Sequence, residues 1–333
     1  MKKRYELIFL AIGLVAVAAM VWSIGLNEIV ANIKQTSWWF VAIVAVRLLV
    51  YPLNTVAWKA VIPQDNGSDA KISFAKLLKL TISGYAINYI TPVMALGGEP
   101  YRILRLKEYV GLKKATSSVL MYAIMHVLSH FVFWILGFVL ILLYPKTNSS
   151  IKIISACFIL LCILASFFIA KFFKSGIAFS FFNTLKKIPI VGKWARKKMT
   201  TEYCDGLQQI DFQIQDLYFN HKNRFFRSLV TETASRIAGC LEILLIMQAI
   251  GMEVNLLEAI IVSTGTSLFA NILFFSPMQL GTKEGGLILA LKSLGMEAAN
   301  GVYIGLAMRI SELFWIIVGV VMIKTYKLKT KIK

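Results

Sequence analysis

Cysteine is scarce in this sequence and follows no recognisable pattern. The 333 residues contain four cysteines. Cys157, Cys162 and Cys240 lie in apolar runs, and Cys204 lies in a basic stretch. Neither the spacing of a disulfide framework nor a CxxC metal-binding motif is present. We therefore interpret the cysteines as small core residues, and neither a disulfide-stapled fold nor a cysteine metal site gains support.

The short motifs of several large enzyme classes are also missing. The sequence contains no GxSxG motif, no Walker motif and no dinucleotide-binding fingerprint. His126 and His130 have the spacing of two metal ligands on a helix, but Val-Leu-Ser stands between them, so the HExxH pattern is absent. No nearby cysteine or carboxylate completes a site. We expect these histidines to pack or to line a cavity, and we expect neither a metal nor a cofactor.

Acidic residues are few relative to basic ones. The chain has 17 Asp and Glu against 36 Lys and Arg, which gives a formal net charge of +19. In a soluble protein this excess would suggest a nucleic-acid partner. Here the basic residues lie in loops and tails beside apolar runs, where anionic lipid headgroups attract them. We therefore expect membrane lipids, above all anionic ones, as partners and no nucleic acid. The sequence does not indicate an oligomeric state.

Long apolar runs make up most of the remaining sequence. Hydrophobic residues account for 58% of the chain, and the mean hydropathy is +0.70. A transmembrane β-barrel would show alternating segments of about 10 residues, and no such alternation dominates. We predict an all-α, polytopic membrane protein with a single transmembrane domain over 1–333. About six continuous spans of helical length are expected near 7–26, 38–60, 114–143, 151–173, 228–250 and 301–323. Two further apolar segments, near 76–111 and 258–296, are interrupted.

Basic residues also predict the orientation of the chain. A Lys-Lys-Arg run at 2–4 precedes the first span, and more Lys and Arg crowd the loop 174–227 and the C-terminal tail. Because cytoplasmic loops carry an excess of these residues, we expect a multi-pass protein of the cytoplasmic membrane with both termini in the cytoplasm. The Ala-Val-Ala at 16–18 is similar to a signal-peptidase site, but apolar residues continue through Trp22. An uncleaved first span is therefore expected.

The basic loop 174–227 lacks the pattern of a separate domain. Leu207, Ile210, Ile214 and Leu217 recur at helical spacing, opposite a polar side that includes Asp211. This pattern predicts an amphipathic helix. The helix either lies on the membrane face or packs against other cytoplasmic loops, and the sequence leaves both possibilities open.

The two interrupted segments share a motif. TPVMALG at 91–97 matches SPMQLG at 276–281 with one gap, and a continuous span follows each copy. With the predicted orientation, the first segment enters the membrane from the cytoplasm and the second from the opposite side. The repeats 76–143 and 258–323 would then be inverted, with re-entrant hairpins that face each other around a substrate site near the midplane, as in transporters. A chance similarity between two proline- and glycine-containing turns is the alternative.

Charged residues lie beside the first helix break. Gly97-Gly98 ends one half-helix, and Pro100 suits the first turn of the next. Glu99 and Arg102 then lie at the N-terminus of a helix that begins inside the membrane, where free N–H groups and the helix dipole favour negative charge. Glu99 either simply caps this helix or belongs to a site that receives a phosphate. In such a site Glu99 would orient Arg102 or exchange a proton. For Arg102 we favour the phosphate site.

The second break and several spans also contain charge. Lys283 and Glu284 follow Gly281, although an ionisable group near the bilayer centre costs about 2.5–3.5 kcal/mol on insertion scales. Other charges within spans include Arg47 and Glu242. Two further pairs at helical spacing form either structural ion pairs or part of the site. These pairs are Glu232 with Arg236, and Arg309 with Glu312.

The two motifs carry a family resemblance. Pro92 followed by Gly97-Gly98-Glu99-Pro100-Tyr101-Arg102, and the later Pro277-x-x-Leu-Gly-x-x-Glu284-Gly285, resemble the signatures of the lysylphosphatidylglycerol synthase transmembrane-region family, also called flippase-like. The resemblance covers nearly the whole chain and implies functional roles for Glu99, Arg102 and Glu284. At the position of Thr282-Lys283 the common family pattern has a different, small residue. The resemblance therefore does not imply a role for Lys283.

The same resemblance shapes the expected function. In that family the membrane region stands alone or is fused to a cytosolic aminoacyl-transferase domain. Because the sequence ends at Lys333, shortly after its last span, we expect a stand-alone membrane region that moves lipid between leaflets and does not synthesise it.

The leading hypothesis is therefore a non-enzymatic flippase for an anionic phospholipid or a polyprenyl-phosphate-type lipid. Its headgroup would enter a charged cavity between the two hairpins. One alternative is a membrane-embedded transferase or hydrolase that uses Glu99 or Glu284 as base and His126 as acid. Another is a non-catalytic partner in envelope assembly. The residues expected to bind substrate are Glu99, Arg102, Lys283, Glu284, Glu232, Arg236, Arg309 and Glu312.

Overall fold

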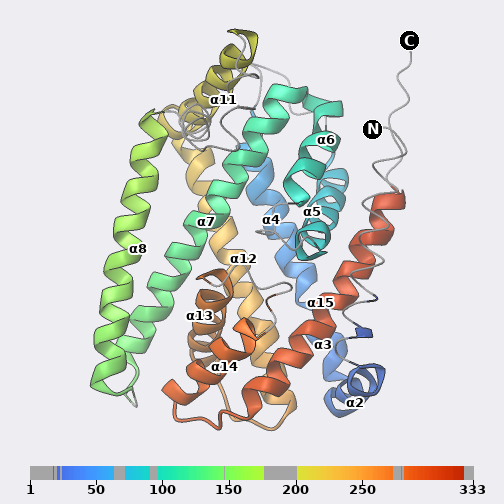
Figure 1. Ribbon diagram of the computed structural model, residues 1–333, viewed down its shortest axis with the longest axis vertical. Coiled ribbons are helices and arrows are strands. Elements are labelled where there is room, and N and C mark those ends of the chain that lie inside the picture. Colours follow the sequence, from blue (N-terminus) through green and yellow to red (C-terminus); the bar gives the residue numbers. More distant parts are fainter. Residues whose placement is uncertain are drawn as a thin grey trace, which may run out of the picture.

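The computed structural model describes residues 25–63, 72–90, 97–145, 147–175, 201–272, 279 and 281–325, together with positions 18, 21 and 22. Within these residues all regular structure is helical, which confirms the all-α prediction (Figure 1). The helices are α2 (Leu26–Thr36), α3 (Trp39–Ala45), α4 (Arg47–Val61), α5 (Phe74–Ile90), α6 (Gly98–Val110), α7 (Leu112–Leu143), α8 (Ser149–Ser175), α11 (Thr201–Phe219), α12 (Lys222–Ala249), α13 (Leu256–Ile272), α14 (Thr282–Ser293) and α15 (Asn300–Thr325).

Among the described residues, four helical stretches are long and apolar enough to cross a membrane. They are Trp39–Val61, Leu112–Leu143, Ser149–Ile169 and Asn300–Ile323, and they coincide with four of the expected spans. The expected span 228–250 lies within the single helix α12, but charged residues such as Glu232, Arg236 and Glu242 lower its hydropathy. Most of the expected first span, 7–26, falls outside the described residues.

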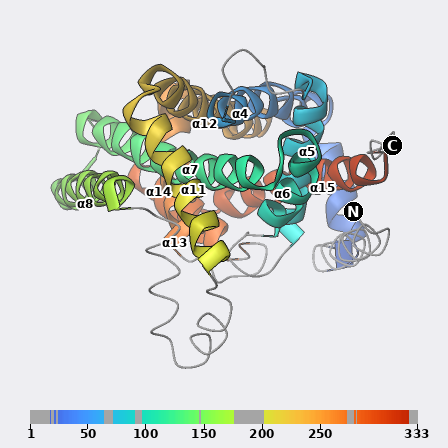
Figure 2. The same ribbon diagram turned by 90° about the horizontal axis from the view of Figure 1, so that it is seen from above.

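Helices from distant parts of the chain lie side by side in the bundle. The closest pairings include α4 with α12 and α5 with α15, so the two halves of the sequence interlock. α8 lies at the outer edge beside α7, as both views show (Figures 1 and 2). Large apolar side chains such as Leu160, Phe167 and Phe168 are exposed on it. An apolar outer surface of this kind is what contact with lipid tails requires.

The interrupted segment 76–111 forms a pair of packed helices, α5 and α6. Glycine allows their close approach: a Cβ on Gly98 would lie 2.2 Å from the carbonyl oxygen of Gly84. Asn88 of α5 accepts a hydrogen bond at 2.6 Å from the Gly98 amide through its Oδ1 atom. This bond satisfies one of the N–H groups that the start of a helix leaves without a partner.

The segment 258–296 forms a second pair, α13 and α14. A Cβ on Gly286 would lie 2.9 Å from the Cα atom of Thr266, so glycine is needed at this contact too. Figure 1 shows α5 and α6 toward one end of the bundle and α13 and α14 toward the other. Residues 91–96, 273–278 and 280, on which the predicted repeat depends, lie outside the described residues.

The expected amphipathic helix is α11. Its apolar residues are buried, and Ile214 retains 2% of its accessible surface. They belong to the same core cluster as residues of α7, with which α11 is in contact. Phe212 points away and is 68% exposed, while Asp211, expected on the polar side, is buried. In the described residues the apolar face of α11 therefore packs against the bundle. Residues 176–200, which form much of the basic loop, lie outside the described part.

Candidate functional site

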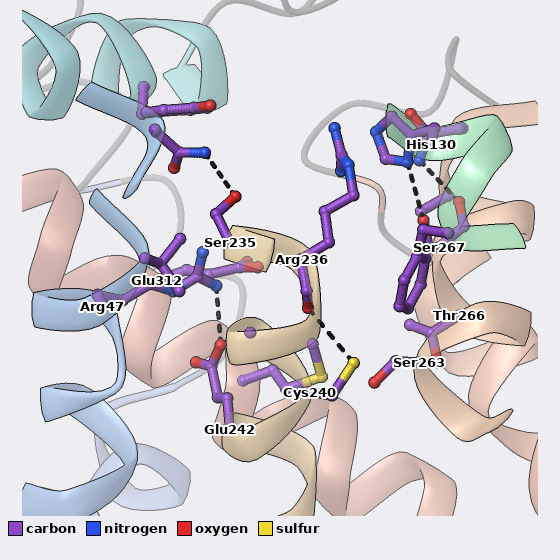
Figure 3. A pocket seen from close by; sticks show the side chains of 18 of the residues that line it. Arg47, His130, Ser235, Arg236, Cys240, Glu242, Ser263, Thr266, Ser267 and Glu312 are labelled. Atoms are coloured by element: carbon purple, nitrogen blue, oxygen red, sulfur yellow. Dashed lines mark hydrogen bonds and ion pairs between the residues drawn. The ribbon is translucent and has the colours of Figure 1, made fainter. Parts of the chain in front are cut away.

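A cavity of about 390 Å³, lined by many polar and charged side chains, lies inside the bundle, within the usual size range of ligand sites. Its lining comes from α4, α5, α7, α12, α13, α14 and α15. Figure 3 shows the Arg47–Glu242 pair on one side and the contact between His130 and Ser267 on the other. Charge is balanced among the lining Arg, Lys, Asp and Glu residues, which are Arg47, Arg236, Lys283, Glu232, Glu242 and Glu312.

The first charge pair connects α4 and α12. Arg47 Nη2 donates to Glu242 Oε2 at 2.8 Å. Arg47 begins α4, and Glu242 lies in the second half of α12. Glu242 is almost fully buried, whereas Arg47 keeps 18% of its side-chain surface. Because a buried carboxylate without a partner is costly, this pair fixes the two helices against each other at the cavity wall.

Glu232 is the most deeply buried carboxylate of the cavity, with no exposed surface. Its Oε2 atom accepts from Asn54 Nδ2 at 3.0 Å, and its Oε1 atom lies 2.7 Å from His126 Nδ1. Arg236 is 3.9 Å from Glu232 Oε1. The Arg236 N–H groups donate instead to Ser129 Oγ and to the carbonyl oxygen of His126, both at 2.8 Å. The i,i+4 pair expected from the sequence is therefore a loose one.

The second break meets the first at Glu312 of α15. Lys283, the second residue of α14, forms an ion pair with Glu312. Tyr89, the penultimate residue of α5, donates to the same Glu312 oxygen at 2.7 Å. The Lys283 ammonium also lies 5.3 Å from the centre of the Tyr89 ring. The end of α5 and the beginning of α14 thus share one carboxylate on the wall of the cavity.

Glu284 is the neighbour of Lys283 and is bound by Arg309 of α15. Arg309 Nε donates to Glu284 Oε1 at 2.7 Å, and Arg309 Nη2 donates to Glu284 Oε2 at 3.0 Å. The Gly281 amide donates to Oε2 as well, at 2.9 Å, so Glu284 caps its own helix. The structure therefore pairs Arg309 and Glu312 each with a residue of α14, whereas their spacing had suggested a pair with each other.

Glu99 and Arg102 lie behind the cavity wall. Glu99 Oε1 accepts from Asn88 Nδ2 at 3.1 Å and from Arg102 Nη1 at 3.3 Å, and Asn88 itself lines the cavity. The Arg102 guanidinium is buried, and its carbon lies 4.8 Å from the Tyr85 ring centre and 5.5 Å from that of Tyr122. Its Nε and Nη2 atoms have no hydrogen-bond partner among the described residues. Arg102 is thus held largely by aromatic faces.

The structure separates the expected site residues into two groups. Lys283, Glu232, Arg236 and Glu312 line the cavity, and Glu99, Arg102, Glu284 and Arg309 flank the helix breaks around it. The lining also includes Arg47 and Glu242, which the sequence showed as charges within spans, and the polar residues Asn54, Tyr89 and His126. Within the described residues, no three His, Cys, Asp or Glu side chains form a cluster that could hold a metal ion.

Comparison with known families agrees with this architecture. The family model described as lysylphosphatidylglycerol synthase TM region matches residues 7–319. The chain belongs to this family. The match covers nearly the whole sequence, as its motifs led us to expect, and makes the chain a membrane protein connected with lipid or envelope biology. Neither the curated proteins nor the solved structures contain a match to it.

Proposed function

We propose that the protein moves a lipid with a phosphate-bearing headgroup between the two leaflets of the cytoplasmic membrane. The headgroup would pass through the cavity while the acyl or prenyl chains stay in the bilayer. The observation that supports this most is the meeting of the α5 and α14 ends at Lys283, Tyr89 and Glu312, in a cavity of about 390 Å³ that has many polar and charged lining residues. A polar cavity between two broken helical segments is the arrangement in which transporters place their substrate.

The cations of the cavity favour a phosphate group. Arg47, Arg236 and Lys283 face the same space, and guanidinium and ammonium groups form strong, charge-assisted hydrogen bonds with phosphate oxygens. Each cation has a protein partner in the structure, which avoids an unpaired charge in a low-dielectric interior. A phosphate would replace a carboxylate such as Glu312 at Lys283. The headgroup therefore enters by exchanging partners, without leaving any cation bare.

Movement would depend on the two hairpins. We propose that α5–α6 enters the membrane from the cytoplasmic side, that α13–α14 enters from the opposite side, and that both termini are cytoplasmic. The contact between Lys283, Tyr89 and Glu312 would then be the point at which one repeat separates from the other. Rocking of inverted repeats around a fixed site exposes it to each side in turn. Loss of this contact would let the two repeats move apart and open the cavity to one side of the membrane.

We favour a transporter over a lipid-headgroup enzyme because the proposed catalytic groups are engaged. Both oxygens of Glu284 already accept hydrogen bonds from Arg309. Glu99 is bound to Asn88 and Arg102. Formation of a new lipid product by the purified protein in detergent would favour the enzyme instead.

The test is leaflet-resolved movement of a fluorescent phosphatidylglycerol in proteoliposomes. Wild-type protein should move the lipid faster than empty liposomes do, and Lys283→Gln should slow it by at least about tenfold, since a hydrogen bond to a charged group contributes about 1.5–3 kcal/mol. Lys292→Gln is the matched control, because Lys292 is exposed on the same helix. Wild-type rates equal to those of empty liposomes would contradict the proposal and favour an assembly role. Uptake of radiolabelled inorganic phosphate, with no lipid movement, would contradict the assignment to a lipid.

A further inference from the structure

His126 and Glu232 form a pair of titratable side chains at the wall of the cavity. Glu232 is completely buried, whereas His126 retains 36% of its side-chain surface and lines the cavity. The His126 Nδ1 and Glu232 Oε1 atoms are 2.7 Å apart. Histidine has an ordinary pKa of about 6.5, so it is the side chain best suited to bind and release protons in this pH range. The proton on His126 decides whether the pair is neutral or carries one negative charge.

The surroundings of the pair connect this charge to the cavity. Arg236 is 3.9 Å from Glu232. Its N–H groups donate hydrogen bonds to Ser129 and to the His126 carbonyl oxygen instead. With His126 protonated, Glu232 has a cationic partner and attracts Arg236 less. With His126 neutral, the charge of Glu232 draws Arg236 toward it. Protonation therefore makes Arg236 more available to an anion in the cavity.

Other groups around His126 come from several helices. The rings of Tyr85 on α5 and Tyr122 on α7 lie 6.1 and 6.4 Å from its ring, and Arg102 on α6 stacks against both tyrosines. His130, one turn along α7, makes a perpendicular ring contact at 5.2 Å. His130 Nδ1 is in turn 3.3 Å from Ser267 Oγ on α13. A polar row thus runs from α12 to a helix of the second hairpin.

The remaining carboxylates of the site are less suited to carry a proton. Glu284 is held by both an arginine and a helix amide, Glu242 is paired with Arg47, and Glu312 is paired with Lys283. Each of these three carboxylates therefore already has a cationic partner. We therefore expect proton exchange at the histidine pair, although the sequence had suggested Glu99 for that role.

We propose that His126 and Glu232 form a proton-binding site, and that a proton binds there together with the anionic headgroup. The inference rests on the proposed transport of a phosphate-bearing lipid and adds its coupling to protons. The proton and the phosphate charge would cross the membrane together, so a pH difference drives lipid toward the alkaline side. No covalent bond changes. The proton leaves His126 when the headgroup leaves Arg236.

The experiment uses proteoliposomes with a pH difference of about one unit and fluorescent phosphatidylglycerol in both leaflets. With wild-type protein the probe should accumulate in the leaflet that faces the alkaline side, by up to about tenfold for one coupled proton, and reversal of the gradient should reverse the accumulation. His126→Gln, which keeps a polar side chain without a titratable group, should abolish the accumulation. His221→Gln should retain it, because His221 is exposed and outside the cavity lining.

A second measurement applies even if His126→Gln moves no lipid. Addition of detergent-solubilised phosphatidylglycerol to purified protein, in weak buffer with a pH-sensitive dye, should cause proton uptake by wild type and none by His126→Gln. Equal uptake by the two proteins would overturn the proton site. If wild-type protein moves the lipid but the probe becomes equally distributed between the leaflets under either gradient, the proton site is also overturned. The transport proposal would then remain intact. Movement no faster than in empty liposomes would overturn transport itself.

Discussion

The Lys283 ammonium lies 5.3 Å from the centre of the Tyr89 ring, although the two residues are far apart in the sequence. Tyr89 is next to the end of α5, and Lys283 is next to the beginning of α14. Both residues bind Glu312. A single carboxylate on α15 therefore connects the two interrupted segments, and disturbance of this contact should affect stability and lipid movement together.

Removal of Lys283 should destabilise the protein by isolating Glu312. Lys283→Gln leaves the buried carboxylate with a hydroxyl partner but no adjacent ammonium, and breaking a buried ion pair costs about 3–5 kcal/mol. The double variant Lys283→Gln/Glu312→Gln should recover most of the loss, because it removes both charges. Thermal unfolding in detergent measures both effects. A double variant that is no more stable than the single one would show that the cost comes from lost packing and not from the unpaired charge.

Two adjacent glycines of α14 should respond in opposite ways to alanine. A Cβ on Gly286 would lie 2.9 Å from Thr266 Cα and 3.0 Å from the Gly265 carbonyl oxygen, and these backbone atoms cannot move aside cheaply. Gly286→Ala should therefore separate α13 from α14 and cost about 1–3 kcal/mol. Nothing lies within 4 Å of a Cβ on Gly285, so Gly285→Ala should be neutral or stabilising by up to about 1 kcal/mol. Equal melting temperatures for the two variants would contradict the packing of this hairpin.

Arg102→Lys should behave as a disruptive change. The guanidinium lies between aromatic rings of α4, α5 and α7, with the Trp58 ring centre 5.6 Å away. A lysine has no planar group to stack on them, so we expect a loss of about 1–2 kcal/mol. Thermal unfolding compared with Arg227→Lys, an exposed change on α12, provides the measurement.

A double-mutant cycle can show that Arg102 occupies the position described. The Arg102 side chain crosses Gly84, where an added Cβ would lie 2.3 Å from Nε. Gly84→Ala should therefore be strongly destabilising alone and much less so in an Arg102→Ala background, because the clashing atoms are gone. Additive effects of the two substitutions would place the guanidinium elsewhere.

The sequence predicted the residues of the cavity better than their pairing. A charged side chain within an apolar run costs free energy in the membrane, so such residues tend to be functional. This principle indicated Lys283, Glu232 and Glu312 before any contact was known. It could not show that Arg47 pairs with Glu242, because those residues are 195 positions apart and only the packing of α4 on α12 brings them together. Spacing along one helix suggested a partner for Arg309 within α15, whereas the structure places its partner on α14.

The helices themselves were easier to predict than their roles. Hydropathy alone predicted spans such as the one near 114–143, observed as Leu112–Leu143, because a continuous apolar run is a local property. The aromatic rings around Arg102 belong to Trp58, Tyr85 and Tyr122 on three different helices. No local sequence pattern predicts that they meet. The helix break before Gly98 could be predicted from its glycines, but the close contact that requires Gly98 is with Gly84 on another helix.

The proposed orientation can be tested through the two ends of α12. This helix has 28 residues, so its ends are about 42 Å apart at about 1.5 Å per residue, farther than the roughly 30 Å of the hydrocarbon core. After replacement of the native cysteines by alanine, Lys222→Cys should react with a membrane-impermeant maleimide only from the cytoplasm. Glu253→Cys, in the exposed turn after α12, should react only from the opposite side. Because the second hairpin begins directly after Glu253, labelling of both positions from the cytoplasm would place the two hairpins on one side and remove the basis for alternating access.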